Sequence, residues 1–104
     1  MDVAISTNKV PVRLTEERWY HISRGHPEMA DHYYEILETI EHPFCIYKGN
    51  SGELVAIKFL REEPPKFIVA IYKEINNEDG FVITAYLSDK QDQFDKKEII
   101  WKQQ

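Results

Sequence analysis

Residues 14–28 read LTEERWYHISRGHPE, and this stretch sets the arrangement of the elements around it. It contains the start and the end of one helix, a tight turn and the start of a second helix. Thr15 is suited to cap the first helix, because its hydroxyl can accept a hydrogen bond from an early backbone N–H. Gly25 is suited to end that helix. The stretch also contains two of the four histidines and two arginines, so we expect it to form one wall of an active site.

The chain has 104 residues, of which 42% are hydrophobic and 30% are charged, a balance typical of one globular domain. Its formal net charge is −5. This charge argues against indiscriminate nucleic-acid binding, because non-specific affinity comes from neutralising phosphates. It does not exclude a local basic cleft, since the potential of a pocket and the net charge of the chain are separate quantities.

Cys45 is the only cysteine, so no internal disulfide can form. The N-terminus lacks the apolar region of a signal peptide, and no apolar run approaches the roughly 18 residues that a membrane-spanning helix needs. These features predict a cytoplasmic protein that does not enter a membrane.

Residues 1–9 are small and polar without a period, which predicts a flexible N-terminal arm. Residues 10–104 are predicted to form a single domain that begins with a short strand at 10–14. The first helix follows Thr15, and the second begins at Pro27 and runs to about Glu41. In the second helix the apolar residues recur with a period of 3.6. They are Met29, Tyr33, Ile36, Leu37 and Ile40.

From Phe44 onward the apolar period changes to two, which predicts strands at 44–48, 53–60, 67–73, 81–88 and 98–101. Helices that precede a run of strands indicate an α+β domain. We expect the N-terminal strand and both helices to pack on one face of an antiparallel meander sheet of about four to five strands. The other face would stay partly open, and Thr84 and Tyr86 alternate onto it, opposite Ile83 and Ala85.

His21 and His26 are the candidate catalytic groups, because two histidines can divide the roles of general base and general acid at neutral pH. Their spacing spans the predicted helix end and the turn. Each has a structural alternative. His26 precedes the second helix and can serve as its cap, and His21 can be a solvated surface residue.

Arg18 and Arg24 are candidates for stabilising negative charge at a phosphate, because a guanidinium binds phosphate oxygens in pairs. The alternative is a surface ion pair with a glutamate such as Glu17 or Glu28, an interaction that is common and weak. The sequence leaves both interpretations open.

Thr84 and Tyr86 present two hydroxyls on one strand face, where they can orient a phosphate or hydrogen-bond a base. The alternative is that both residues reflect strand propensity alone. Lys58 and Lys73 lie on neighbouring predicted strands and can add positive charge to this face. Lys73 belongs by alternation to the apolar face of its strand and stands at the strand end, so Lys58 is the preferred candidate.

No metal site is expected, because the chain has neither paired cysteines nor the His-Glu-x-x-His spacing of a zinc helix. A glycine-rich phosphate loop is also missing, and no cofactor is expected. Cys45 lies in a predicted strand with no group beside it that would activate a thiol.

Taken together, the ordered segments 14–22, 25–28 and 81–87 resemble the phage-associated branch of the barnase–EndoU–colicin–RelE-like ribonuclease superfamily. The closing residues 99–101 are similar to the way such domains often end. The resemblance extends from about residue 11 to residue 101. The family pattern commonly has an arginine directly before the His-Pro-Glu, and this chain has Gly25 there.

The resemblance implies a compact α+β fold and metal-free cleavage of RNA, in which the ribose 2′-hydroxyl attacks the adjacent phosphorus. It implies that the two histidines are the acid–base pair and that one of the two arginines stabilises the pentavalent phosphorane. It further implies that Thr84 and Tyr86 position the phosphate. Many members resemble toxins that a small antitoxin or immunity protein neutralises.

The sequence supports two alternative functions. The first is a small, toxin-type endoribonuclease whose substrate is RNA, since only RNA supplies the 2′-hydroxyl. The second is a non-catalytic protein-interaction module with the same fold, which the acidic net charge and Gly25 favour. The nuclease requires both histidines to face the side of the sheet that carries Thr84 and Tyr86. No repeat or coiled-coil pattern indicates an oligomeric state.

Overall fold

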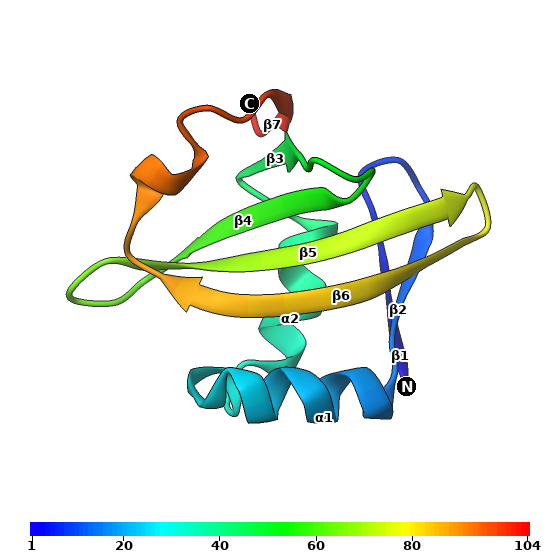
Figure 1. The fold of residues 1–104 in the computed structure, drawn as a ribbon, viewed down its shortest axis with the longest axis horizontal. Helices are drawn as coiled ribbons and strands as arrows, with labels where there is room; N and C mark the ends of the chain where they lie inside the picture. Colours follow the sequence, from blue (N-terminus) through cyan, green and yellow to red (C-terminus); the bar gives the residue numbers. More distant parts are fainter.

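The computed structural model describes residues 1–104 and shows one mixed sheet with two α-helices and two short 3₁₀ helices (Figure 1). The strands are β1 (Asp2–Ile5), β2 (Pro11–Leu14), β3 (Cys45–Lys48), β4 (Leu54–Leu60), β5 (Lys66–Asn76), β6 (Asp79–Ser88) and β7 (Ile99–Lys102). The helices are α1 (Glu16–Gly25) and α2 (Tyr33–Glu41), and the 3₁₀ helices are η1 (Pro27–Met29) and η2 (Gln91–Phe94). Neither helix has the length and apolar character needed to cross a membrane.

The strands follow the order β1-β2-β6-β5-β4-β3-β7. The run from β3 to β6 forms the predicted antiparallel meander, and the α+β class is confirmed. The sheet has seven strands instead of the expected four to five, because β2 and the unforeseen β1 join the same sheet as the meander. It is also not wholly antiparallel, since β2 runs parallel to β6 with Val12 opposite Gly80 and Arg13 opposite Phe81.

Residues 1–9 differ from the flexible arm that their polar composition predicted. Asp2–Ile5 form β1, which pairs antiparallel with β2. The turn between them contains Lys9 with a φ of 67°, and the N–H of Ser6 donates to the carbonyl of Val10 at 2.9 Å. Only Ala4 is buried within β1. A single inward position is too short for a period of two to appear in the sequence.

The predicted start of α1 is confirmed, because Thr15 Oγ1 accepts a hydrogen bond from the backbone N–H of Arg18 at 3.1 Å. The predicted end is wrong in its detail. Gly25 is the last helical residue and does not have a left-handed φ. His26 ends the helix, with its N–H bonded to the carbonyl of Ile22 at 2.8 Å.

The second helix, predicted to run without a break from Pro27 to Glu41, is interrupted. Pro27–Met29 form a single 3₁₀ turn, and α2 begins only at Tyr33. Met29 is nevertheless buried with Ile36 and Ile40. Met29 fits the helical spacing in the sequence, but it reaches the core from η1 and not from α2.

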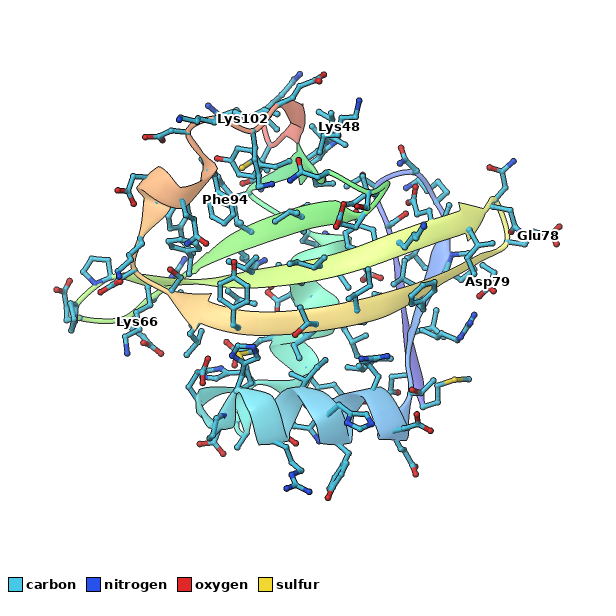
Figure 2. All side chains as sticks on the ribbon, in the orientation of Figure 1. Lys48, Lys66, Glu78, Asp79, Phe94 and Lys102 are labelled. Atoms are coloured by element: carbon cyan, nitrogen blue, oxygen red, sulfur yellow. The ribbon has the colours of Figure 1, made fainter.

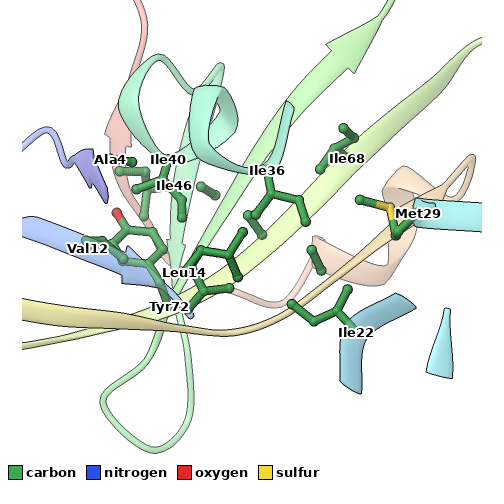
Figure 3. Close-up of a cluster of buried hydrophobic side chains, with 14 residues drawn as sticks. Ala4, Val12, Leu14, Ile22, Met29, Ile36, Ile40, Ile46, Ile68 and Tyr72 are labelled. Carbon is green, nitrogen blue, oxygen red and sulfur yellow. The ribbon is translucent and has the colours of Figure 1, made fainter. Parts of the chain in front are cut away.

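The main core lies between α2 and the sheet, since α2 passes behind the central strands (Figure 1). Fourteen buried side chains form it (Figure 3), among them Leu14, Ile22, Ile36, Ile40, Ile68 and Tyr72. Burying side chains of this size contributes roughly 1.5–3 kcal/mol each to folding. This layer fixes one face of the sheet against the helices.

The opposite face of the sheet carries a smaller cluster of six buried residues, namely Cys45, Val55, Ile57, Phe67, Val69 and Phe94. Phe94 comes from η2, which follows β6 and folds back toward β3 and β4 (Figure 2). The face that we expected to be open is therefore covered on the side of β3 and β4. It remains accessible along β6, where Thr84 and Tyr86 are half-buried.

The parallel pair β2–β6 determines where the end of α1 lies. It aligns the start of α1 with Phe81, because α1 follows β2 directly. Helix α1 then lies along β6 (Figure 1). The ten residues of α1 rise about 15 Å, and the strand from Phe81 to Tyr86 spans about 16 Å. The end of α1 is therefore placed beside Tyr86.

Candidate active site

The imidazole of His26 and the phenol of Tyr86 lie against each other at the end of α1. Their ring centroids are 5.7 Å apart and their planes differ by 31°. The two residues are far apart in the sequence, and the matched lengths of α1 and the β6 segment from Phe81 to Tyr86 bring them together. The nuclease hypothesis requires both histidines to face this side of the sheet, and this contact places His26 there.

The side chain of His26 does not serve as the helix cap that the sequence offered as an alternative. Its backbone occupies the position before η1, but its side chain makes no capping hydrogen bond. The Nδ1 atom instead lies 3.4 Å from Oε2 of Glu28. A carboxylate beside one ring nitrogen favours the tautomer with the proton on that nitrogen, which leaves Nε2 as the base. The His26 ring therefore lies between the Tyr86 ring and the Glu28 carboxylate, and it is not used as a cap.

Tyr86 is fixed by the turn that follows β6. Its O–H donates to Oε1 of Gln93 at 3.0 Å. The amide nitrogen of Gln93 donates in turn to the Ser88 hydroxyl at 2.9 Å and to the Lys90 carbonyl at 2.6 Å. Burial raises the pKa of the Tyr86 phenol. The hydroxyl therefore stays protonated at neutral pH and remains a hydrogen-bond donor.

Thr84 lies on the same face as Tyr86, as the strand alternation predicted. The register with β5 places Tyr86 opposite Val69 and Thr84 opposite Ile71. The apolar side of β5 therefore shares this face with the two hydroxyls, whereas the sequence suggested separate apolar and polar faces. The hydroxyls stand at the border of a buried apolar patch.

The helical spacing turns His21 away from α2. Trp19 packs on Tyr33 of α2 with ring centroids 5.1 Å apart, and Ile22 is buried. At 100° per residue, His21 lies about 160° around the helix from Trp19, and Arg18 and Arg24 each lie about 60° from His21. All three side chains are exposed. The ring of His21 packs on that of Tyr20, with centroids 5.8 Å apart, and not on Tyr86.

Arg24 is not brought to the site. Its Nη1 donates to the hydroxyl of Tyr20 at 2.7 Å, and its guanidinium lies 5.5 Å from the centroid of that ring. Tyr20 is exposed on the side of α1 opposite the buried Ile22. Of the two arginines that the sequence nominated, Arg24 is therefore held by Tyr20, and the guanidinium of Arg18 makes no hydrogen bond or ion pair.

Lys58 is on the wrong face of the sheet for the role that the sequence assigned to it. It pairs across the strands with Ile68, a residue of the main core. Its Nζ lies 3.0 Å from Oε1 of Glu38 and donates to the carbonyl of His42 at 3.2 Å. Lys73, which the sequence reasoning set aside, is two residues from Ile71 and therefore shares the face of Thr84.

A cavity of about 230 Å³ adjoins this corner of the molecule. Glu28, Lys66, Leu87, Ser88 and Asp89 line it. It lies at the end of the β5–β6 hairpin marked by Lys66 in Figure 2, and Asp79 marks the other end. Two carboxylates and one ammonium give it a mixed charge. The cavity is thus not the uniformly basic cleft of a non-specific nucleic-acid binder.

Sequence reasoning did not select Glu28 or Gln93 as site residues. Glu28 was considered only as an ion-pair partner of an arginine, and the signal that was missed is its position two residues after His26. Gln93 lies in a charged segment whose fold-back depends on Phe94 reaching the second apolar cluster. No group of three or more His, Cys, Asp or Glu side chains is arranged to bind a metal ion.

Comparison of the chain with protein-family models, with curated proteins and with solved structures found no match. The functional argument therefore rests on the geometry of His26, Tyr86 and their neighbours.

Proposed function

We propose that this protein is a small, metal-independent endoribonuclease, of the toxin type that its sequence resembles. The observation that carries the proposal is the contact between His26 and Tyr86, with Thr84 on the same strand face. These groups combine a titratable base with two hydroxyl donors, a set suited to an RNA phosphodiester. A small antitoxin or immunity protein that covers this corner would be its natural inhibitor.

In the proposed reaction His26 takes the proton of a ribose 2′-hydroxyl, and the 2′-oxygen attacks the neighbouring phosphorus. The bond from phosphorus to the 5′-oxygen breaks, and the leaving oxygen takes a proton from an acid. The products are a 2′,3′-cyclic phosphate and a 5′-hydroxyl end. His21 is the nearest further histidine along α1, about 7.5 Å of helix rise before His26. It is the proposed acid.

Tyr86 and Thr84 have the role of holding the phosphate. A protonated phenol donates a hydrogen bond to a non-bridging phosphate oxygen, which replaces the Gln93 carbonyl that it contacts in the structure. Such donors are most effective when they are aimed in advance at the charge that develops in the transition state. Gln93 provides this preorganisation, and Arg18, whose guanidinium no other side chain holds, is the proposed source of added positive charge.

The test is cleavage of a defined RNA by the purified protein in the presence of a chelator. We expect the products to carry 2′,3′-cyclic phosphate ends, and the 2′-deoxy analogue to stay intact. His26→Ala should lower the rate by roughly 10²–10⁴-fold, the usual range for a general base or acid. His42→Ala is the matched control, because His42 is an exposed histidine beyond the far end of α2.

Two outcomes would contradict the proposal. One is an absence of RNA cleavage by the wild-type chain under these conditions. The other is cleavage that persists unchanged in the double variant His21→Ala/His26→Ala, because the activity would then belong to a contaminating nuclease.

A protein-interaction module is the second candidate function, and the edge strand β7 favours it. Three consecutive large apolar residues, Ile99, Ile100 and Trp101, are at least 36% exposed on this strand. Only β3 pairs with β7, so its outer edge has free backbone donors and acceptors. An exposed apolar edge strand is a template for a partner strand.

This second function is tested by affinity capture with the wild-type chain and an Ile100→Lys variant as matched baits. The module predicts one stoichiometric partner that the variant loses, without any RNA turnover. Recovery of no such partner by the wild-type bait argues against it.

A further inference from the structure

We propose that Lys73 and Phe81 form a second nucleotide subsite, at the far end of the strand face that begins with His26 and Tyr86. The inference rests on the proposed ribonuclease function and adds a path for the RNA chain across the sheet. An RNA strand would run from the His26–Tyr86 contact past Thr84 to this subsite.

The register of the sheet places the two residues side by side. Lys73 of β5 is directly opposite Phe81 of β6, and Ile71 is opposite Thr84. A register shift lies between these pairs, at Ile71 and Tyr72. Tyr72 points into the main core, so Lys73 points to the other face, the one that carries Thr84.

The second cation of the subsite comes from β2. Arg13 is opposite Phe81 in the parallel pair β2–β6, and its neighbours Val12 and Leu14 are buried in the core. Its guanidinium carbon lies 5.9 Å from the centroid of the Phe81 ring. Asp79, at the start of β6, forms an ion pair with Arg13. Arg13 is thus held in place over the aromatic ring.

Lys73, by contrast, forms no ion pair or hydrogen bond. Its aliphatic end lies near Gly52, in the turn before β4. The carboxylate of Glu53, which Lys73 influences electrostatically, already accepts the backbone N–H of Ser51 at 2.7 Å. That hydrogen bond is the main reason why the pKa of Glu53 is lowered, and Lys97 and Lys73 contribute to the same effect. Lys73 keeps its own donors free for a phosphate.

The combination of an ammonium group and a half-exposed aromatic ring is the usual arrangement for binding a single-stranded nucleic acid. The cation contacts a phosphate, and a base stacks on the ring without sequence preference. Four strand residues separate Val69, opposite Tyr86, from Lys73, and this is about 13 Å. The subsite therefore lies beyond the reach of a dinucleotide bound at His26.

The experiment measures binding of a fluorescent 2′-deoxy octanucleotide, which the 2′-hydroxyl reaction cannot cleave, as a function of salt. We expect Lys73→Ala to weaken binding roughly five- to tenfold and to reduce the salt slope by about 0.7, the value for one lost phosphate contact. Phe81→Leu retains an apolar side chain and should weaken binding by roughly fivefold or more, with little change in slope. Lys58→Ala is the matched control, since Lys58 lies on the neighbouring strand with its ammonium on the opposite face.

Kinetics with RNA substrates of two lengths complete the test. Lys73→Ala should raise KM for an octanucleotide roughly five- to tenfold and leave kcat and the cleavage of a dinucleotide unchanged. Equal effects of Lys73→Ala and Lys58→Ala, or no binding by the wild-type chain, would overturn the subsite. Binding that depends on Lys73 without any RNA cleavage would instead refute the nuclease and leave the subsite in place. The two proposals can therefore fail separately.

Discussion

The ring of His26 contacts the ring of Tyr86 although sixty residues separate them in the chain, with centroids 5.7 Å apart. Three features produce this contact. The parallel pair β2–β6 aligns the start of α1 with Phe81, α1 and β6 run together, and the length of α1 nearly equals the span of β6 from Phe81 to Tyr86. A change in the length of α1 by a few residues would separate the two rings. The contact therefore depends on where α1 begins and ends.

We predict that Tyr86→Phe will lower kcat/KM for RNA by about 10–100-fold and leave the fold unchanged. The variant keeps the ring that contacts His26 and removes only the O–H that would donate to the phosphate. A hydrogen bond to a charged group contributes about 1.5–3 kcal/mol, which corresponds to this range of rates. Steady-state kinetics and circular dichroism check both parts. Wild-type activity in Tyr86→Phe would remove Tyr86 from the mechanism.

We predict that Arg24→Gln will change the rate of RNA cleavage by less than about twofold. The guanidinium of Arg24 is bound to the exposed Tyr20 on the side of α1 away from the sheet. Arg18→Gln is the comparison, since the guanidinium of Arg18 has no such partner in the structure, and it should lower kcat/KM by about tenfold. The kinetics of both variants should be measured on one RNA. A larger loss for Arg24 than for Arg18 would show that the contact with Tyr20 does not keep Arg24 from the RNA.

We predict that an arginine at position 25 will be accommodated and will raise activity. A Cβ atom built on Gly25 meets nothing within 4 Å, and the residue is helical. Gly25→Ala should therefore stabilise the protein by about 0.5–1 kcal/mol through helix propensity. Gly25→Arg should give a similar stabilisation and, in addition, raise kcat/KM by about tenfold by placing a cation next to His26.

Thermal unfolding and kinetics of the two Gly25 variants separate these contributions, because alanine reports the helix alone. Equal kcat/KM in the alanine and arginine variants would mean that a cation next to His26 gives no help to catalysis.

We predict that Tyr72→Phe will stabilise the protein by about 1 kcal/mol. The hydroxyl of Tyr72 is buried in the main core and has no hydrogen-bond partner (Figure 3). A buried polar group without a partner is unfavourable, so its removal in an isosteric ring is expected to stabilise the fold. Urea denaturation measures the effect, and a loss of stability would show that the hydroxyl has a partner.

We predict that ionisation of Tyr72 lowers the stability of the folded protein at high pH. Burial raises the pKa of Tyr72 above its ordinary value, so the unfolded chain ionises at a lower pH than the folded protein. The stability is then fully present below about pH 10 and decreases as the pH rises above that value. Tyr72→Phe should show a smaller decrease between pH 9.5 and 11. A decrease of equal size in both proteins would assign it to Tyr33 and Tyr47, whose pKa values burial raises to about 12.

The local elements of this protein could be predicted because their causes are local. Thr15 caps α1 as its hydroxyl and position indicated, and β4, β5 and β6 form where β-branched and aromatic residues predicted strands. The second helix was predicted as one element because Met29 fell into its period. Its division into η1 and α2 depends on packing, which no spacing rule contains.

The candidate site was predicted in part. His26, Thr84 and Tyr86 were selected for their chemistry, and the structure places all three at one side of the sheet. The selection of Lys58 was wrong, because alternation alone does not say which side of a strand faces the helices. Lys58 pairs across the strands with the core residue Ile68, and Lys73 lies on the other side. Which side chains of β4 and β5 face α2 is set by the burial of whole apolar clusters.

Propensity, periodicity and the chemistry of single side chains were enough to predict the α+β class, the boundaries of most strands and the residues able to move protons or bind phosphate. They could not predict that β2 joins β6 in parallel, that Arg24 turns to Tyr20 or that Glu28 and Gln93 contact His26 and Tyr86. These relationships join residues through the pairing of distant strands and the packing of η2. Their free energy arises only once the sheet and both apolar clusters have formed.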